Sequence, residues 1–469
     1  PLCRDLNAMH IHTLGAVALG AALARRDVTA LAATQHYLDR IARLNPRLKA
    51  FTHLDAAGAL AAADEADARL DKGQGLGPLD GVPIGVKDNI AVAGLPMTCG
   101  VEGRRHAIAS EDAFCVTLLR EQGAVILGTL NMHEGALGAT TDNAAYGRCI
   151  NPWRDAFTPG GSSGGSGAAV AAGLCAAALG TDTMGSVRIP AAYCGVFGFK
   201  PSYGRISSAG LGHLSWTLDH IGPLARRAED LRALMACLAT GHVGAMVTVP
   251  SPDYRDFWLD EPVLFAGLTV GVLEADVDLE PGVAAVYQAA LDRLRTLGAV
   301  LEPVRLDVPA PGMLRRKGLL ISEAEGAAAF AAELASGQGL SDGFRGLLEW
   351  GARQPAVKLA EAHLAVLEAR ATIRRQMAFL GLDLLVSPTA PQIAFAHDAA
   401  VPANQADFTC LANFADLPAA SVPAGFADSL PVGLQIIGPE LSDAFVLRVA
   451  MKLDAAFNPV VLAPDPEGA

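Results

Sequence analysis

Residues 158–167 read TPGGSSGGSG and lead directly into AAVAAGLCAAALG at residues 168–180. The apolar stretch is too short and too rich in small residues to span a bilayer, and it predicts a buried, tightly packed helix over 168–178. Loops rich in Gly and Ser expose backbone N–H groups, and the positive end of a helix dipole favours negative charge there. The two stretches therefore predict a core helix whose N-terminal loop can bind an anionic group.

Three hypotheses compete for this loop. A Walker-type phosphate loop needs Lys and then Ser or Thr after its last Gly, and Ala168 follows instead. Gly160, Ser162 and Gly164 match the nucleophile elbow of α/β-hydrolases, but that motif needs an apolar strand before it, and DAFTP at 155–159 is a poor one. A flexible linker is disfavoured, because the loop lies between a Trp-containing segment and an apolar helix. An α/β-hydrolase acting through Ser162 stays open as an alternative.

Two further segments carry candidate chemistry. GTDTMGSVRIP at 180–190 places Ser186 after a tight turn of small residues, where consecutive N–H groups can point at one spot. This geometry suits an oxyanion hole, although Gly-Ser turns are common. GVPIGVKDNI at 81–90 carries Lys87 out of the apolar run Val82–Val86. Most lysines lie in solvent, so neither segment alone identifies a site.

Helices and strands alternate along the rest of the chain, as is typical of an α/β fold. The apolar spacing predicts a helix over 31–45 that ends at Asn45-Pro46, and a second helix that Asp55 caps and that runs through Leu70. We expect one domain over residues 1–469, with a helical segment 10–75 packed on a core at 80–230. Further expected strands are 82–86, 124–127, 268–273, 383–387 and 431–438, and further expected helices are 111–122, 281–297 and 442–456.

The composition excludes several classes of protein. Of the 469 residues, 51% are hydrophobic and 18% charged, and the formal net charge of −13 disfavours nucleic acid and anionic membranes as partners. No secretory signal is visible at the N-terminus. The eight cysteines contain no CxxC pair, so we expect reduced thiols and a cytoplasmic protein. His133-Glu134 does not extend to HExxH, so the sequence predicts no metal site.

Taken together, these segments resemble the amidase signature family. The resemblance covers essentially the whole chain, and its motifs are residues 81–90, 158–173, 180–207 (GTDTMGSVRIPAAYCGVFGFKPSYGRIS), 218–230 (LDHIGPLARRAED), 387–391 (SPTAP), the region around Thr409–Asn413, and 417–438. The resemblance implies a large twisted mixed β-sheet covered by α-helices on both faces. It also implies the hydrolysis of amides without a cofactor or metal.

The resemblance also implies roles for particular residues. A Ser–cisSer–Lys triad maps the nucleophile to Ser186, the bridging serine with a cis peptide bond to Ser162, and the base to Lys87. The oxyanion-hole N–H groups map to Thr183, Met184, Gly185 and Ser186, and supporting hydrogen-bond positions map to Ser163, Asp182 and Arg188. The family most often has Gly where this chain has Met184, and a positive φ would strain a side chain there. We expect Met184 to shape the substrate pocket.

This chemistry has a physical reason. A serine hydroxyl is a weak nucleophile until a base removes its proton, and lysine can act as that base only when it is neutral. The reference pKa of lysine is about 10.4, and burial lowers it. The Val82–Val86 run would carry Lys87 into the interior and desolvate it. Ser162 would then relay a proton from Ser186 to Lys87, so no histidine is required.

Other residues near these motifs have simpler interpretations. Arg188 is better explained as an anchor of its loop, through an ion pair with Asp182, than as a substrate contact. The histidines near the motifs are expected to be packing or loop residues; they are His133, His213 and His220. Candidate substrate contacts, with core packing as the alternative for the last two, are residues 141–143, Tyr146, Tyr203 and Trp216.

The sequence thus predicts a stand-alone amidase for a small or aryl-bearing amide, with carbamates, ureas and esters as alternative substrates. The competing hypothesis is the glutaminase (A) subunit of a tRNA-dependent amidotransferase, which works inside a complex; Met184 in place of Gly disfavours it. A non-catalytic relative is disfavoured because Lys87, Ser162 and Ser186 are all present. The expected partner is a small-molecule amide, and a homodimer is the default assembly. The sequence does not specify which amide is cleaved.

Overall fold

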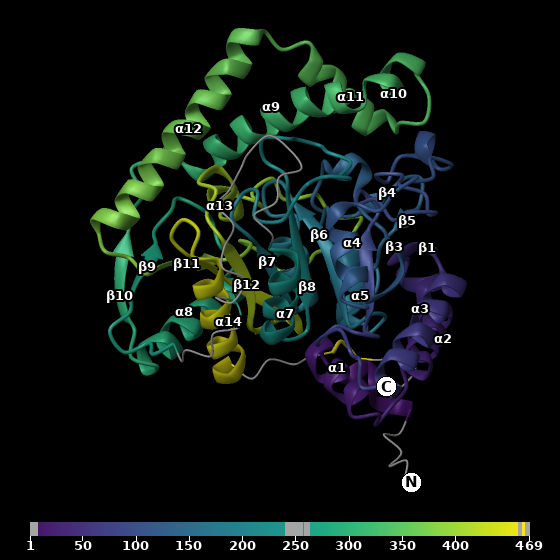
Figure 1. Cartoon of the computed structure of the whole chain (residues 1–469). Helices are drawn as coiled ribbons and strands as arrows, with labels where there is room; N and C mark the ends of the chain where they lie inside the picture. The colour runs from purple at the N-terminus through teal and green to yellow at the C-terminus, as the bar shows by residue number, and fades with distance from the viewer. Residues whose placement is uncertain (1–7, 240–256, 258–262, 458–461, 465–469) are drawn as a thin grey trace.

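A large mixed β-sheet forms the centre of the molecule. The computed structural model describes residues 8–239, 257, 263–457 and 462–464. Eleven strands pair in the order β1-β3-β2-β6-β8-β7-β12-β13-β11-β9-β10, with helices on both faces (Figure 1). The expected mixed α/β sheet covered by helices is confirmed. That residues 1–469 form a single domain stays a prediction.

The strands of the sheet span almost the whole chain. They are β1 (Phe51–Leu54), β2 (Pro83–Lys87), β3 (Val125–Leu130), β6 (Ala177–Asp182), β7 (Phe197–Lys200), β8 (His220–Ala225), β9 (Thr269–Leu273), β10 (Val300–Val304), β11 (Leu384–Pro388), β12 (Ala419–Ala427) and β13 (Leu430–Ile437). A separate two-stranded ribbon consists of β4 (Asp142–Asn143) and β5 (Gly147–Arg148).

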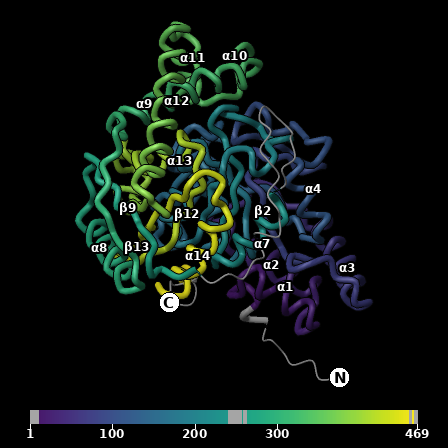
Figure 2. The backbone as a smooth tube through the Cα atoms, turned by 60° about the vertical axis from the view of Figure 1, so that its left-hand side comes forward, coloured from purple at the N-terminus to yellow at the C-terminus, as the bar shows by residue number. Residues whose placement is uncertain are grey.

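The helices of the described residues vary widely in length. They are α1 (Ala16–Ala24), α2 (Ala30–Leu48), α3 (Ala56–Asp71), α4 (Phe114–Glu121), α5 (Gly164–Ala171), α6 (Arg188–Cys194), α7 (Ala228–Leu238), α8 (Pro281–Thr296), α9 (Pro311–Ala329), α10 (Ala331–Ser336), α11 (Asp342–Ala352), α12 (Ala356–Phe379), α13 (Thr409–Phe414) and α14 (Asp443–Phe457). Figure 2 shows α10 and α11 standing out from the body of the molecule. No helix in these described ranges is both long and apolar enough to cross a membrane.

The helix predicted over 168–178 is wrong in its extent. Helix α5 begins earlier, at Gly164, and ends at Ala171. Gly173 then adopts the left-handed conformation (φ 64°), which commonly ends a helix. The apolar residues that follow form the buried strand β6. A central strand covered on both faces has a continuous apolar sequence, so its composition resembles that of a buried helix.

The helix predicted over 31–45 is also wrong at its C-terminal end. Helix α2 continues through Pro46 to Leu48 and ends where Lys49 takes a left-handed conformation (φ 49°). Asn45 does not stop the helix; its side chain bonds both backbone groups of Phe51, at the start of β1. The Asp55 cap of the next helix is confirmed, since its carboxylate accepts the Gly58 N–H at 2.9 Å. The other expected helices and strands are confirmed to within about three residues at each end.

The N-terminal helices are tied to the core by a buried cation. The Arg40 guanidinium on α2 donates to the carbonyl oxygens of Ala172 (2.8 Å) and Gly173 (3.2 Å), just after α5 ends. A cation at this position interacts favourably with the negative end of the α5 dipole. The expected packing of the N-terminal helical segment on the core is thus seen at this contact.

Candidate active site

The candidate site lies at one edge of the central sheet. Strands β2 and β6 are parallel neighbours, with Ile84 opposite Ala177 and Val86 opposite Leu179. Carboxyl ends of parallel neighbours lie at the same edge, where α/β proteins place their ligands. Lys87 is the last residue of β2 and Asp182 the last of β6. The register therefore brings residues far apart in sequence to one place.

Lys87 is completely buried among hydroxyl groups. Its Nζ atom lies 2.7 Å from Ser162 Oγ and 2.7 Å from Thr181 Oγ1. Burial lowers the pKa of Lys87 to about 7, with Asp219 and Asp182 acting weakly in the opposite direction. An appreciable fraction of this side chain is therefore a neutral amine at neutral pH, which is the form that can accept a proton.

The Gly/Ser loop is held firmly around Ser162. The Gly161–Ser162 peptide bond is cis. Thr141 Oγ1 donates to the Gly160 carbonyl (2.8 Å), and the His133 N–H donates to the Ser162 carbonyl (3.0 Å). Ser163 is fixed against β6, since its hydroxyl donates to the Thr181 carbonyl (3.0 Å) and accepts the Thr181 N–H (3.1 Å). The loop therefore has little freedom to move Ser162 away from Lys87.

Ser186 lies on the wall of a cavity of about 150 Å³. Its carbonyl accepts the Ser163 N–H at 3.2 Å, which joins the two serine-bearing loops. Within the described residues, no hydrogen bond connects the hydroxyls of Ser162 and Ser186. Such bonds are often long before substrate binds. The cavity wall is mainly apolar, with Met184, Ile189, Leu214 and Leu319 among its members.

The turn before Ser186 presents backbone donors. The Gly185 N–H donates to Asp182 Oδ1 at 2.7 Å, so this donor is already occupied. The N–H groups of Thr183, Met184 and Ser186 have no partner within the described part of the chain. Gly185 holds the positive φ of the turn (135°), and Met184 is not among the residues with positive φ. The strain considered for Met184 is therefore absent, and glycine stands where the backbone needs it.

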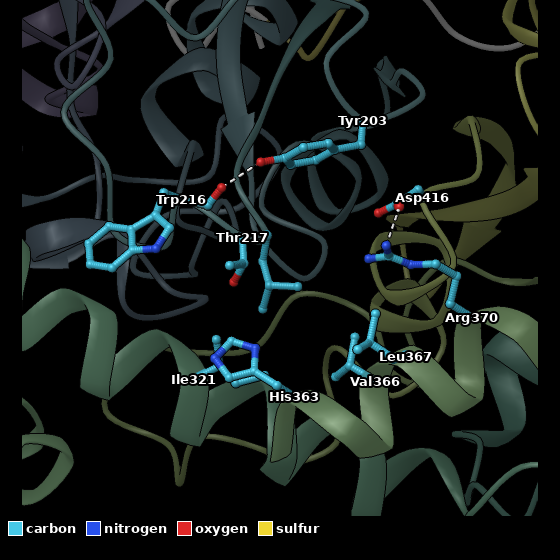
Figure 3. Close-up of a pocket in the computed structure, with 10 residues that line it drawn as sticks. Tyr203, Trp216, Thr217, Ile321, His363, Val366, Leu367, Arg370 and Asp416 are labelled. Atoms are coloured by element: carbon cyan, nitrogen blue, oxygen red, sulfur yellow. Dashed lines mark hydrogen bonds and ion pairs between the residues drawn. The ribbon is translucent and has the colours of Figure 1, made fainter. Parts of the chain in front are cut away.

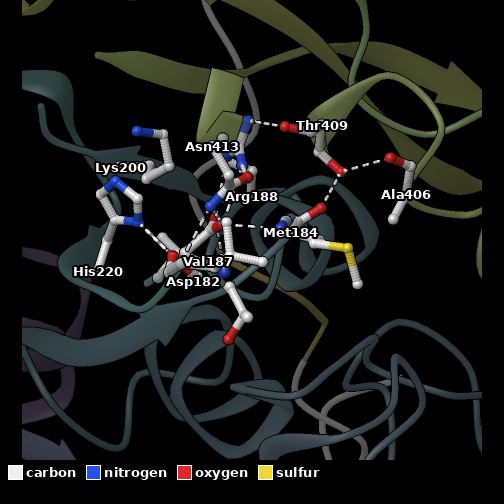
Figure 4. A network of polar contacts seen from close by, with 12 residues as sticks. Asp182, Met184, Val187, Arg188, Lys200, His220, Ala406, Thr409 and Asn413 are labelled. Carbon is white, nitrogen blue, oxygen red and sulfur yellow. Dashed lines mark hydrogen bonds and ion pairs between the residues drawn. The ribbon is translucent and has the colours of Figure 1, made fainter. Parts of the chain in front are cut away.

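Behind this turn lies a buried charge network (Figure 4). Arg188 makes a two-pronged ion pair with Asp182 (Nε–Oδ2 3.0 Å, Nη2–Oδ1 2.9 Å), and both side chains are fully buried. Burial alone would raise the pKa of Asp182, but the charge and hydrogen bonds of Arg188 and a bond from Asn413 hold it far below its usual value. The expected ion pair of Arg188 with Asp182 is confirmed.

Arg188 also extends the network across the sheet. It donates to the Asn413 side chain (2.6 Å), the Gln435 side chain (2.6 Å) and the Thr409 carbonyl (2.9 Å). Thr409 in turn donates through its hydroxyl to the Met184 carbonyl (2.6 Å). These bonds tie the turn to β6, α13 and β13, so it is preorganised.

Other candidate residues have structural surroundings. The Asn143 amide donates to the Gly100 and Met132 carbonyls, and Asp142 forms a surface ion pair with Arg148. Tyr203 and Trp216 line a different cavity from the one that holds Ser186. The histidines expected to be loop or packing residues bond nearby groups: His133 bonds Thr140, His213 bonds Asp219, and His220 bonds two carbonyls. No group of three His, Cys, Asp or Glu side chains suited to a metal ion occurs among the described residues.

Two residues near the catalytic loops were missed by the sequence reasoning. Thr181 shares Lys87 with Ser162, and Asp219 accepts the Thr183 hydroxyl at 2.6 Å as well as the N–H groups of Leu214 and Ser215. Thr181 lies inside the GTDTMGSVRIP motif, so its position there was a usable signal. Asp219 is distant in sequence and becomes a neighbour only because β8 pairs with β6.

The mixed sheet and a buried Lys–Ser pair beside a second serine are features of a hydrolase. The sequence model of the Amidase family matches residues 32–447, and the chain belongs to that family. The A chain of the glutamyl-tRNA(Gln) amidotransferase of Chloroflexus aurantiacus is 38% identical over 94% of this chain and 96% of its own length. A relative of the same name from Anaeromyxobacter dehalogenans is 37% identical over 98% of this chain and 99% of its own.

Solved structures agree with this assignment. The peptide amidase of Stenotrophomonas maltophilia matches with a TM-score of 0.85 and 29% identity, over 96% of this chain and 98% of its own. The fold is therefore that of an amidase-family hydrolase.

Proposed function

We propose that this chain hydrolyses a carboxylic amide through an acyl ester on Ser186, with Lys87 as the base and Ser162 as the proton relay. The observation that carries the proposal is the 2.7 Å contact of a completely buried lysine amine with Ser162 Oγ, one loop away from Ser186. A neutral amine in this position can accept the Ser162 proton, and Ser162 can then accept the proton of Ser186. The lowered pKa of Lys87 supports this role.

The proposed steps balance in atoms and protons. Ser186 Oγ attacks the carbonyl carbon while its proton passes through Ser162 to Lys87. The carbonyl oxygen becomes an oxyanion, and the C–N bond then breaks as the nitrogen takes a proton back through Ser162. Water next attacks the Ser186 ester by the same relay and releases the carboxylic acid. The leaving amine or ammonia carries the nitrogen.

The oxyanion would be stabilised by backbone donors of the turn. Among the described residues, Thr183, Met184 and Ser186 each offer an N–H without a partner, whereas the Gly185 N–H is occupied by Asp182. We therefore narrow the expected oxyanion donors from four to these three. Donors of this kind are worth on the order of 3 kcal/mol each in the transition state. Asp182, Arg188 and Ser163 act as positioning residues, because they hold the loops and do not line the cavity.

The cavity supports a small substrate with an apolar body. A volume of about 150 Å³ is comparable to an engineered apolar cavity that binds benzene. Among the described residues that line it, Arg315 is the one charged side chain, and Asp407 pairs with it at 2.5 Å. An uncharged acyl group would leave that pair undisturbed. A cytoplasmic location stays part of the proposal, and the described cysteines are free thiols, which suits a reducing compartment.

A second candidate is the glutaminase component of an amidotransferase. Curated relatives with 36–38% identity over most of this chain are named as the A chain of glutamyl-tRNA(Gln) amidotransferase. The Arg315–Asp407 pair also favours it, because a guanidinium beside a carboxylate complements the carboxylate and ammonium groups of glutamine. This candidate uses the same Ser186 chemistry and differs in substrate and in its need for protein partners.

One experiment separates the two candidates. The purified chain is given a benzoyl anilide and, separately, L-glutamine, and release of aniline and of ammonia is measured. Hydrolysis of the anilide by the chain alone supports a stand-alone amidase. Glutamine hydrolysis that appears only with co-purified partner proteins supports the glutaminase component. Absence of both activities, with no label on Ser186 from a fluorophosphonate, contradicts the proposed chemistry itself.

A further inference from the structure

A second cavity lies away from Ser186. It has a volume of about 300 Å³, within the range of small-molecule sites. The rings of Tyr203 and Trp216 form one side, and Ile321, Val366 and Leu367 contribute an apolar side from α9 and α12 (Figure 3). Aromatic and aliphatic walls of this kind suit a flat apolar body.

This cavity is distinct from the candidate catalytic pocket, although α9 contributes to both. Within the described part of the chain, no residue lines both cavities. On α9, Leu319 and Ser322 face the catalytic pocket, whereas Ile321 faces the second cavity. A ligand in the second cavity would therefore lie across α9 from Ser186 and would not contact it.

Arg370 supplies the charged end of the second cavity. Its Nε atom donates to the Phe414 carbonyl (3.1 Å), and its Nη1 atom pairs with Asp416 (2.9 Å). Its Nη2 atom makes no hydrogen bond within the described part of the chain, and Figure 3 shows the guanidinium turned toward the cavity. An arginine fixed at two of its nitrogens has a third donor held in place for an acceptor.

The charges around Arg370 favour an anion over a cation. Asp416 is shared by two guanidinium groups, since Arg374 also lies 3.4 Å from its Oδ2. The other partner of Arg374, Glu440, is half exposed and therefore screened by solvent. At the opposite end, the Trp216 ring N–H is a donor without a partner among the described residues. The cavity thus offers donors at both ends and an apolar middle.

We infer that this cavity is a binding site for a small carboxylate with a flat apolar body, whose carboxylate accepts hydrogen bonds from Arg370. The ring or chain of the ligand would lie between Trp216 and the apolar residues of α9 and α12. Arginine is suited to this role because its planar donors match the geometry of a carboxylate.

The test uses a matched pair of probes. Binding of indole-3-propionate and of tryptamine to the purified full chain is measured by isothermal titration calorimetry. The two have similar bodies and opposite charges. We expect the acid to bind at one site per chain and at least about tenfold more tightly than the amine. Equal binding of the two, tighter binding of tryptamine, or no binding of the acid at millimolar concentration would overturn the proposal.

Two variants locate the site. Leu367→Trp places a larger ring at the cavity wall, and Leu364→Trp makes the same change at a residue on the same helix that does not line the cavity. Both leucines are about half exposed (53% and 55%), so both variants should fold. We expect at least tenfold weaker binding of the acid with Leu367→Trp and unchanged binding with Leu364→Trp. An equal effect of the two would place the ligand elsewhere.

Two further measurements separate this site from the catalytic pocket. Arg370→Gln, checked for folding by its thermal unfolding temperature, should weaken binding of the acid at least tenfold and remove the preference over the amine. Labelling Ser186 with a fluorophosphonate should leave binding of the acid unchanged. Loss of binding after labelling would assign the ligand to the catalytic pocket and overturn the inference.

Discussion

The sulfur atom of Met184 lies directly against Gly318 of α9: a Cβ atom at position 318 would lie 2.6 Å from that sulfur. It would also lie 2.5 Å from the ring of Phe414. Both separations are well below van der Waals contact, so position 318 accepts no side chain while Met184 keeps its place. Met184 lines the cavity beside Ser186. The methionine that stands in the usual glycine position therefore occupies space that a glycine on α9 leaves open.

This contact predicts a specific cost for one methyl group. Gly318→Ala should lower the free energy of unfolding by about 1–3 kcal/mol, because it overpacks the core, and should lower kcat/KM by displacing Met184. Met184→Ala in the same chain should recover part of both losses, with the Phe414 contact accounting for the rest. Chemical denaturation and steady-state hydrolysis of an anilide measure the four members of this double-mutant cycle.

Gly346 supplies the control for that prediction. It lies in α11, and a Cβ atom there would meet nothing within 4 Å. Gly346→Ala should raise the free energy of unfolding by about 0.5–1 kcal/mol through helix propensity alone. If Gly318→Ala behaved in the same way, the contact with Met184 would not constrain the pocket.

The assignment of the nucleophile predicts where a covalent label forms. Ser186→Ala should reduce turnover by about 10⁴-fold or more while the circular dichroism spectrum and unfolding temperature stay unchanged. A fluorophosphonate should label Ser186, as located by peptide mass spectrometry. A label on Ser162 would instead favour the nucleophile elbow, and substantial turnover by Ser186→Ala would contradict the mechanism.

The buried ion pair behind the turn predicts a large loss of stability. Arg188→Ala leaves Asp182 buried without its cation, and a loss of about 3–5 kcal/mol is usual for such a change. The exposed pair of Arg148 with Asp142 is the comparison, and Arg148→Ala should cost less than about 1 kcal/mol. Because the pKa of Asp182 is depressed in the folded state, its stabilising effect should persist at neutral pH and fade only in acid, below about pH 4. Urea unfolding at pH 7 and pH 3 tests both statements.

The sequence predicted the fold best where one local signal dominated. Asp55 caps its helix as expected, because a carboxylate three residues before a backbone N–H needs no tertiary context. The stretch 168–180 was misjudged because small apolar residues serve equally well in a buried helix and in a central strand. The turn at Gly173 separates the two elements, and its conformation is set by the packing of the chain.

The candidate site divides in the same way. Motif spacing predicted Lys87, Ser162 and Ser186, and the register of β2 with β6 explains why the first of these lies near the Gly/Ser loop. Which backbone donors are free could not be predicted, because Gly185 is occupied by a carboxylate whose position depends on Arg188 and Asn413. Asp219 was missed because only sheet pairing brings it to Thr183.

The acid limb of the pH–rate profile provides the last prediction. Lys87 must be neutral to accept a proton, and burial lowers its pKa to about 7. Below that pH the amine is protonated and cannot act as the base, so kcat/KM should fall about tenfold for each pH unit and level off above it. Hydrolysis of an anilide between pH 5 and pH 9 measures this limb. Lys87→Met should remove the limb and leave only a small, nearly pH-independent rate.

Lys200 is the matched control for this limb, because burial also lowers its pKa to about 7. Lys200 is equally buried on β7, but its Nζ atom donates to the Pro201 carbonyl and it does not line the cavity that holds Ser186. Lys200→Met should therefore keep the limb near pH 7, whatever it does to stability. If the limb disappeared with Lys200→Met and survived in Lys87→Met, the titrating base would be assigned to the wrong lysine. Since both amines lose their charge in the same pH range, only this pair of variants can separate them.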